Sequence, residues 1–286
     1  MRKDDFKGIG DNFDVDNAAS ILKEKGIDMP TDDLAMTMMD KDSKEYQDWW
    51  DKRQLKADLW ATNEWLKNKK RDFLLKGSVY SEHGVLDHTF DEHKPAKGTP
   101  ERIAYAKAMG IAYRIGTKHE KFNAMLTGLP GRGKTYLAVS ILNYIHENAN
   151  PRLSCMFVSV AKMSSWELRA VKSNDQTEQD KVNNLEKRCA MVDVLVLDDL
   201  GSESVFDNSK REKVASDYTQ KWLFRIAEAR IGMTTIITTN LNGDKQTQVY
   251  DGKIVSRLMT RNPDNVVTFD NVEDHRNQPT QTGLEV

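Results

Sequence analysis

One stretch of the chain has the residue types and the spacing that hold a nucleoside triphosphate. Residues 128–135 fit the phosphate-loop pattern G-x-x-x-x-G-K-[ST]. Glycines let backbone N–H groups curve around a phosphate without a Cβ in the way. Lys134 is placed to reach the β- and γ-phosphates, and the Thr135 hydroxyl to ligate Mg²⁺. The pattern predicts binding of ATP with Mg²⁺ by Gly128, Leu129, Pro130, Gly131, Arg132, Gly133, Lys134, Thr135 and Tyr136.

A second stretch places two carboxylates at the end of an apolar run. Val194 to Leu197 is followed by Asp198 and Asp199. In a phosphate-loop ATPase, Asp198 would hold Mg²⁺, usually through water. Asp199 would orient or deprotonate the attacking water. The alternative is that both residues only cap a helix.

Two later residues suit the same chemistry. Asn240 follows the apolar run 234–239, where it can hydrogen-bond the γ-phosphate or the water, although Asn after a strand is also ordinary turn chemistry. Arg257 follows a short helical stretch after Gly252, and a guanidinium stabilises the charge on a transferring phosphoryl group. From the residues alone, a surface salt bridge explains Arg257 equally well.

The elements that must position these residues alternate along the chain. Apolar runs predict strands over 122–127, 153–160, 192–197, 234–239 and 266–269. Helical patterns occupy 136–147, 166–169, 179–190 and 216–230, the polar residues 173–180 predict a loop, and a helix over 101–115 precedes the first strand. Such alternation predicts an α/β fold, with a five-stranded parallel sheet covered by helices on both faces.

The N-terminal part differs in character. Residues 42–76 contain no glycine or proline, and leucines and a phenylalanine recur at helical spacing in a helix that also carries four tryptophans and a basic cluster at 67–71. The apolar residues are Leu55, Leu59, Leu66 and Phe73 with Trp49, Trp50, Trp60 and Trp65. Two interpretations stay open: packing within the N-terminal part, or a docking face for a partner protein.

Composition limits the other functions. The net charge is −2, so nucleic acid can be contacted only by a local patch, for which Lys162, Lys210, Arg211 and Lys213 are candidates beside the alternative of ordinary solvated side chains. Cys155 and Cys189 lie in apolar stretches and predict buried free thiols. No signal-peptide core or membrane-length apolar run occurs, so we expect a cytoplasmic protein with no membrane partner.

Together these residues resemble the AAA+ ATPases, and within them the bacterial and phage replicative-helicase loaders of the DnaC/DnaI type. The resemblance covers about residues 77–276 and includes the Thr89-Phe90 segment before the core. It implies that Asn240 is the sensor-1 residue and Arg257 an arginine finger for a neighbouring subunit. It also suggests Arg276 as a reduced sensor-2 arginine and Arg230 near a subunit boundary. The family often has Glu where this chain has Asp199, one methylene shorter.

The resemblance implies two regions with different functions. Residues 1–76 would form a helical helicase-binding region and residues 77–286 the P-loop AAA+ core, without a full helical lid because 17 residues follow Phe269. The leading hypothesis is an ATP-dependent DNA replication protein that forms homo-oligomers, binds the replicative DNA helicase and single-stranded DNA, and loads the helicase. An IstB-type transposition regulator, which binds duplex DNA and a transposase, is the alternative. A nucleotide kinase would have no use for Asn240 and Arg257 as placed.

Overall fold

The computed structural model describes residues 40–80, 82, 84–92, 94–173, 175–203, 205–207, 212–269 and 271–274. The chain divides into two units, residues 1–64 and 65–286. In the first unit the described residues contain most of helix α3 (Lys44–Gly77), which begins where Ser43 Oγ accepts from the backbone N–H of Tyr46. The remaining elements belong to the second unit.

Helix α3 is present where the sequence predicts it. The leucines and the phenylalanine predicted to recur at helical spacing share one face of this helix, whereas the four tryptophans are distributed around the rest of it. Trp50, Leu55, Leu59 and Trp60 are 45 to 68% exposed. Large exposed apolar side chains are typical of surfaces that meet a partner.

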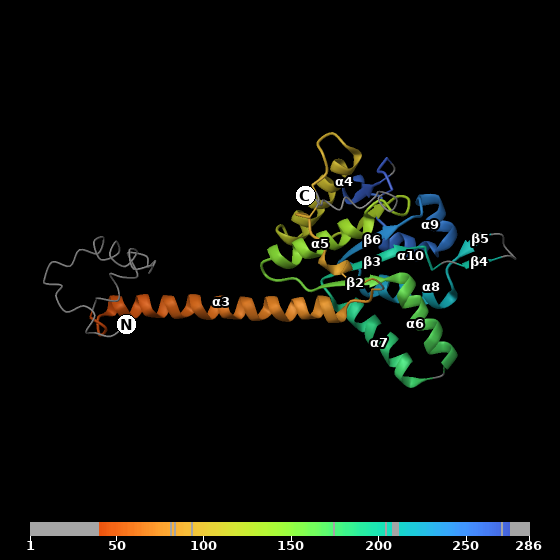
Figure 1. Cartoon of the computed structure of the whole chain (residues 1–286). Helices are drawn as coiled ribbons and strands as arrows, with labels where there is room; N and C mark the ends of the chain where they lie inside the picture. Colours follow the sequence, from red (N-terminus) through yellow and green to blue (C-terminus); the bar gives the residue numbers. More distant parts are fainter. Residues whose placement is uncertain are drawn as a thin grey trace, which may run out of the picture. The chain divides into compact units, whose positions relative to one another are not determined.

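A five-stranded parallel sheet forms the centre of the second unit, as predicted (Figure 1). Its order is β2-β3-β6-β1-β7. The strands are β1 (Ala124–Thr127), β2 (Cys155–Ser159), β3 (Val194–Leu200), β6 (Thr234–Thr239) and β7 (Val266–Thr268). Because β1 lies between β6 and β7 and β6 lies beside β3, the ends of these strands bring distant parts of the sequence together.

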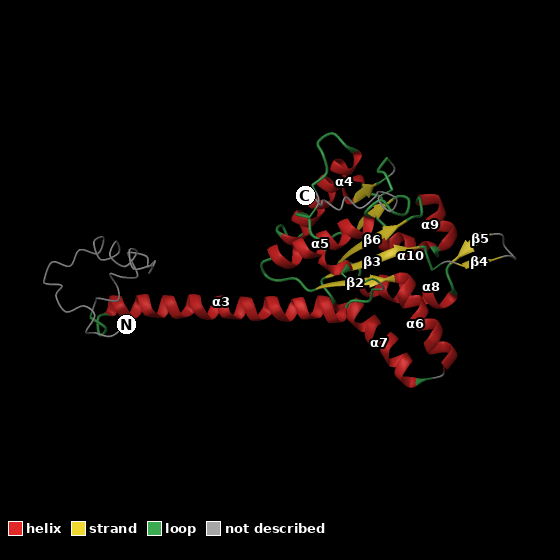
Figure 2. Ribbon diagram, viewed as in Figure 1, coloured by secondary structure: helices red, strands yellow, loops and turns green. Residues whose placement is uncertain are grey.

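Helices cover both faces of the sheet (Figure 2). One face packs against α4 (Pro100–Gly116) and α5 (Lys134–Asn148). The other packs against α6 (Val160–Ser173), α7 (Gln176–Met191), α8 (Asp217–Ala229), α9 (Gly243–Val249) and α10 (Gly252–Leu258). Alternate residues of β3 point into the two cores, so the strand is apolar throughout until it reaches its carboxylates.

The chain enters this unit through the last turns of α3. Lys67 Nζ lies 2.6 Å from Glu147 Oε2, and Arg71 Nη1 donates to Asn143 Oδ1 at 2.6 Å. The basic cluster at 67–71 is therefore partly used to hold the end of α3 against α5. Beyond the helix, Val79 forms a parallel bridge with Val158 at the edge of β2.

Some elements differ from the sequence prediction. Helix α7 begins at Gln176, inside the stretch predicted as a loop, because Asp175 caps it by accepting from the N–H of Thr177 at 2.8 Å. A two-stranded antiparallel sheet, formed by β4 (Val205–Asp207) and β5 (Glu212–Val214), was not predicted. The 3₁₀ turns are η2 (Val85–Asp87) and η3 (Pro263–Asn265).

Two smaller expectations have an outcome. Cys155 and Cys189 are free and buried, as predicted, and burial raises the pKa of each thiol to about 12. Among the described helices, none combines the length and apolar character needed to cross a membrane.

Candidate nucleotide-binding and hydrolysis site

The loop between β1 and α5 has a backbone that requires glycine. Gly131 has φ 79°, and a Cβ built on it would lie 2.1 Å from Asp274 Oδ1. A Cβ on Gly128 would lie 2.7 Å from Phe269 Cβ. Since real Cβ atoms do not approach this closely, the segment after β7 closes one side of the loop, and other residues there would strain it.

Lys134 lies at the beginning of α5 and is held by the loop itself. Its Nζ donates to the carbonyl oxygens of Gly128 and Leu129, both at 2.8 Å, and the residue is 7% exposed. The positive end of the α5 dipole points to the same place. Ammonium, helix end and loop amides therefore form a single site suited to an anion.

Asp198 is the point where three elements meet. Its Oδ1 accepts from Thr135 Oγ1 on α5 at 2.9 Å and from Thr238 Oγ1 on β6 at 2.7 Å. Burial raises the pKa of this carboxyl, and the two hydroxyl donors oppose the shift. Mg²⁺ prefers hard oxygen ligands, and a hydroxyl and a carboxylate oxygen lie together here. The donor set of Thr135 and Asp198 fits the predicted Mg²⁺.

Asp199 sits in an irregular part of β3. The register to β6 shifts between Leu197 and Leu200, and Asp199 has φ 56°, which is uncommon for a residue with a side chain. Its N–H donates to Thr238 Oγ1 at 2.7 Å. Bulges beside active sites re-aim a side chain. Here the irregularity lets the successive side chains of Asp198 and Asp199 both line the same cleft.

Asn240 at the end of β6 contacts Asp199. Its Nδ2 donates to Asp199 Oδ1 at 3.1 Å, while its Oδ1 is buried with no hydrogen-bond partner among the described residues. A buried amide oxygen without a donor costs about 1–3 kcal/mol. The structure thus brings Lys134, Thr135, Asp198, Asp199 and Asn240 together, as the sequence analysis expects.

A cleft of about 790 Å³ connects these residues. Part of its lining comes from residues that no sequence pattern assigned to the site: Tyr80, Val85 and His88. The His88 and Tyr136 rings are 4.8 Å apart, and Tyr136 donates its hydroxyl to Thr89 O at 2.6 Å. The aromatic side chains of Tyr80 and His88, between α3 and α4, were the available sequence signal for this part of the site.

Arg257 does not line this cleft. Its Nη2 lies 2.6 Å from Glu228 Oε1, and its guanidinium carbon lies 5.5 Å from the centre of the Phe224 ring. Within one chain it therefore makes the surface salt bridge that was the alternative interpretation. Arg276, the suggested sensor-2 residue, lies outside the described residues.

Arg230 is buried within the chain, and its expected place near a subunit boundary remains a prediction. It is 3% exposed and donates to five oxygens from the amino-end side of the sheet. These are Thr235 Oγ1 and the carbonyl oxygens of Cys189, Val192, Asp193 and Thr234, at 2.5 to 3.3 Å. Burial lowers its pKa to about 10, so the group stays charged at neutral pH.

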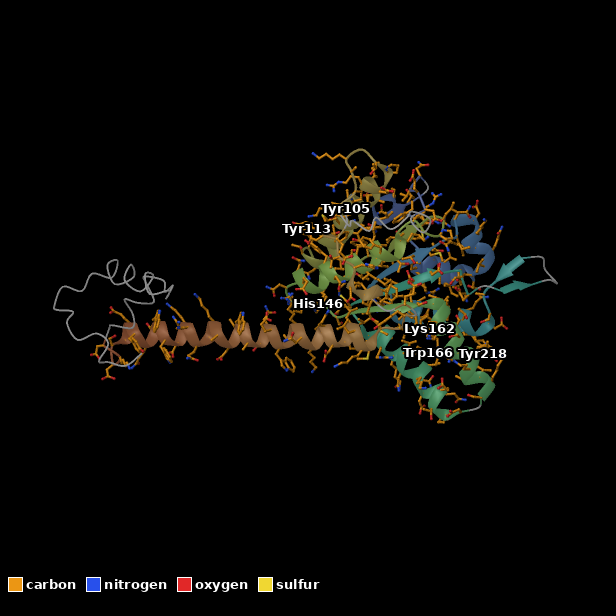
Figure 3. The ribbon with its side chains drawn as sticks, viewed as in Figure 1. Tyr105, Tyr113, His146, Lys162, Trp166 and Tyr218 are labelled. Carbon is orange, nitrogen blue, oxygen red and sulfur yellow. The ribbon has the colours of Figure 1, made fainter. Side chains whose placement is uncertain are left out.

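Two of the candidate DNA-contacting residues lie on described elements. Lys162 is half-buried in the first turn of α6, and Trp166 follows on the next turn of that helix (Figure 3). Lys210 and Arg211 lie outside the described residues, and Lys213 belongs to β5. Whether these residues contact DNA remains a prediction.

Comparisons with known proteins place this geometry in a family. Residues 93–262, more than half of the 286-residue chain, match the family model described as IstB-like ATP binding protein. The chromosomal replication initiator protein DnaA of Rickettsia massiliae (strain Mtu5) is 31% identical over 116 residues, which are 41% of this chain and 24% of that protein. The chain thus matches about a quarter of that relative's length.

Among solved structures, that of DnaI is 20% identical with a TM-score of 0.50, covering 68% of this chain and 95% of DnaI. The DnaC helicase loader is 20% identical with a TM-score of 0.46, covering 66% of this chain and all of that one. The likeness to DnaI is one of fold, and it supports the predicted α/β arrangement of a five-stranded parallel sheet covered by helices. The family match confirms a phosphate-loop protein that binds ATP.

Proposed function

Because the chain belongs to the family of IstB-like ATP binding proteins, we propose that it uses ATP to load a replicative DNA helicase onto DNA. The observation that carries the ATPase part is the junction at Asp198, which accepts from Thr135 on one side and Thr238 on the other. This junction joins the phosphate loop, the carboxylate strand and the Asn240 strand. A purely structural loop needs no such convergence.

Each residue has a role in this proposal. Lys134 neutralises charge at the β- and γ-phosphates. Thr135 and Asp198 would hold Mg²⁺, which would supply electrostatic stabilisation of the phosphates. Asp199 positions the attacking water and accepts its proton. Asn240 orients Asp199 through Nδ2 and offers its free Oδ1 to the water.

The helicase-loading part rests on helix α3. Trp50 and Trp60 are 45% and 68% exposed. Aromatic residues are enriched at protein interfaces and often dominate their energy. A duplex-DNA binder would instead need a basic face there, and residues 44–64 carry both signs of charge. This mixed surface favours a protein partner over duplex DNA.

The test is capture of partners from host lysate by the full chain, with identification of the bound proteins. We expect the replicative helicase to be recovered by the wild type and lost with Trp50→Ala/Trp60→Ala. The matched control is Met191→Ala, since Met191 is 79% exposed on the ATPase unit. Recovery of a transposase, together with tight binding to duplex DNA, would instead establish the transposition regulator, which the family description keeps as the second candidate.

Oligomerisation enters the proposal through Arg257. A finger supplied to a neighbour's ATP couples hydrolysis to assembly. Arg257→Ala should then bind ATP but hydrolyse it poorly, whereas Lys134→Ala should fail to bind ATP but keep an intact Arg257. Mixing the two, with helicase and single-stranded DNA present, should restore activity with a maximum at an intermediate ratio. A straight line between the two inactive ends, with mixed oligomers demonstrated, rejects the role in trans.

A further inference from the structure

We propose that Glu203 is a positioning residue that fixes the turn carrying Asp199 and ties it to the junction of α9 and α10. The inference rests on the proposed function, since it concerns how hydrolysis at Asp199 is set up. Glu203 is not among the residues that line the cleft, so it acts through others.

The turn after β3 is short and locked by its own hydrogen bonds. Ser202 donates its N–H to Asp199 O at 3.2 Å and its Oγ to the same oxygen at 2.8 Å. Gly201 N–H donates to Glu203 Oε2 at 2.9 Å. The carboxylate therefore closes the turn that holds Asp199 at positive φ, a conformation that persists only when its surroundings over-determine it.

The turn also has no room to relax toward β6. Gly201 has φ 106°, and a Cβ there would lie 2.7 Å from Leu241 Cδ1. Leu241 directly follows Asn240, the residue that donates to Asp199. The backbone of the carboxylate turn thus packs closely against the segment that carries the amide.

The second oxygen of Glu203 points to a different element. Tyr250 donates its hydroxyl to Glu203 Oε1 and is 3% exposed. Tyr250 ends α9, where its N–H donates to Gln246 O at 3.0 Å, and the next residue, Asp251, caps α10. Burial raises the pKa of Tyr250, so its hydroxyl remains a donor.

One half-buried carboxylate therefore joins the hydrolytic turn to the start of α10, the helix that contains Arg257. Because these hydrogen bonds connect the two elements, a displacement of α10 would also displace Asp199. Residues that orient a reacting group through hydrogen bonds change turnover strongly, because small misplacements cost up to about a hundredfold in rate. They leave substrate binding nearly unchanged.

The test compares Glu203→Ala with Glu203→Gln, which keeps an acceptor for Gly201 and a partner for Tyr250. We expect Glu203→Ala to lower kcat about tenfold or more with KM for ATP within about twofold. Glu203→Gln should recover most of kcat, and Tyr250→Phe should be intermediate. The control is Glu167→Ala, which removes a buried carboxylate from α6, outside the site, and should leave kcat unchanged.

Amide hydrogen exchange of the folded protein gives a readout independent of activity. Peptides covering 199–203 and 246–254 should exchange faster in Glu203→Ala and return toward wild type in Glu203→Gln. Unchanged exchange in both segments overturns the inference, as does a kcat loss that Glu203→Gln does not repair. A wild type no more active than Lys134→Ala would reject the proposed function, whereas the exchange result would still decide the role of Glu203.

Discussion

The two ends of the central sheet both bury charged groups, but they treat them differently. At the amino ends of β3 and β6, the Arg230 guanidinium donates to five oxygens of the surrounding backbone and Thr235. At the carboxyl ends, Asp198 and Asp199 are held by Thr238 and Asn240, and the Asn240 oxygen stays without a donor among the described residues. In the first arrangement all hydrogen bonds of the charged group are made within the chain. In the second, a buried polar atom is left to bind a ligand or a water molecule.

This difference separates a structural from a functional cluster of charges. A buried group whose hydrogen bonds are all made within the chain mainly stabilises the fold. A group with unused capacity beside a large cleft can act on a ligand. An unpartnered atom is not enough alone, since His146 Nε2, Glu167 Oε2 and Trp222 Nε1 also lack partners among the described residues. None of the three lines the nucleotide cleft.

The largest effect is expected at the structural end. Arg230→Met should lower the free energy of unfolding by roughly 3 kcal/mol or more, because each buried carbonyl left without a donor costs about 1–3 kcal/mol. Chemical denaturation measures the change, and Arg230→Lys should retain part of the stability. ATP affinity of the folded variant should stay at the wild-type value. A stable Arg230→Met protein with altered ATPase activity would break the distinction between the two ends.

At the other end, Asp199→Asn should separate binding from turnover. The amide keeps the shape but cannot take the proton, so turnover should fall about a hundredfold while ATP still binds. Steady-state ATPase rates and titration calorimetry check the two quantities, and stability should change little. If turnover is undiminished, another group activates the water and Asp199 only shapes the turn.

A smaller effect is expected for Lys134→Ala in ATP binding. Loss of the ammonium should weaken affinity at least about tenfold, or 1.4 kcal/mol, in titration calorimetry. Lys172→Ala is the control, because Lys172 is exposed on α6 away from the cleft. Equal affinity of Lys134→Ala and wild type would mean that the loop does not hold the phosphates.

The sequence predicts the second of these regions better than the first. The phosphate loop is a local pattern that the sequence shows directly. The apolar runs before Asp198 and Asn240 indicate buried parallel strands, and the carboxyl ends of such strands meet at one edge of the sheet, so the two residues are expected to lie near each other. The hydrogen-bond partners of Arg230 lie in three places: on α7, in the segment that precedes β3, and on β6. No local sequence pattern connects these places. The order of parallel strands is likewise set by tertiary packing.

The same reasoning explains the missed wall of the cleft and the bulge. Tyr80 and His88 reach the cleft only because Val79 pairs with Val158 and Asn143 holds the carbonyls of Leu86 and His88. The positive φ of Asp199 depends on a register shift between strands that are distant in sequence. Propensity along a linker or strand does not encode either contact.

The smallest expected effect concerns a buried carboxylate outside both regions. Glu167 is 7% exposed, and burial raises its pKa to about 7, with Arg225 opposing the shift and Glu186 adding to it. Since the unfolded value is 4.5, the folded chain binds more protons between these two pH values. Stability must therefore fall as pH rises from about 4.5 through 7, and below 4.5 the group contributes no pH dependence.

Glu167→Gln removes that proton uptake. The difference in the free energy of unfolding between this variant and the wild type should therefore shift in favour of the variant by on the order of 1 kcal/mol from pH 5 to pH 8. Denaturation curves at the two pH values measure the gain, and Asp180→Asn, at an exposed position on α7, should show none. The ATPase rate should be the same in both variants, because Glu167 lies outside the cleft. A changed rate would mean that an unpartnered buried atom marks function even without a cleft. Parallel stability curves for Glu167→Gln and wild type would instead mean that the carboxyl reaches solvent when it ionises, and that burial alone does not decide its charge.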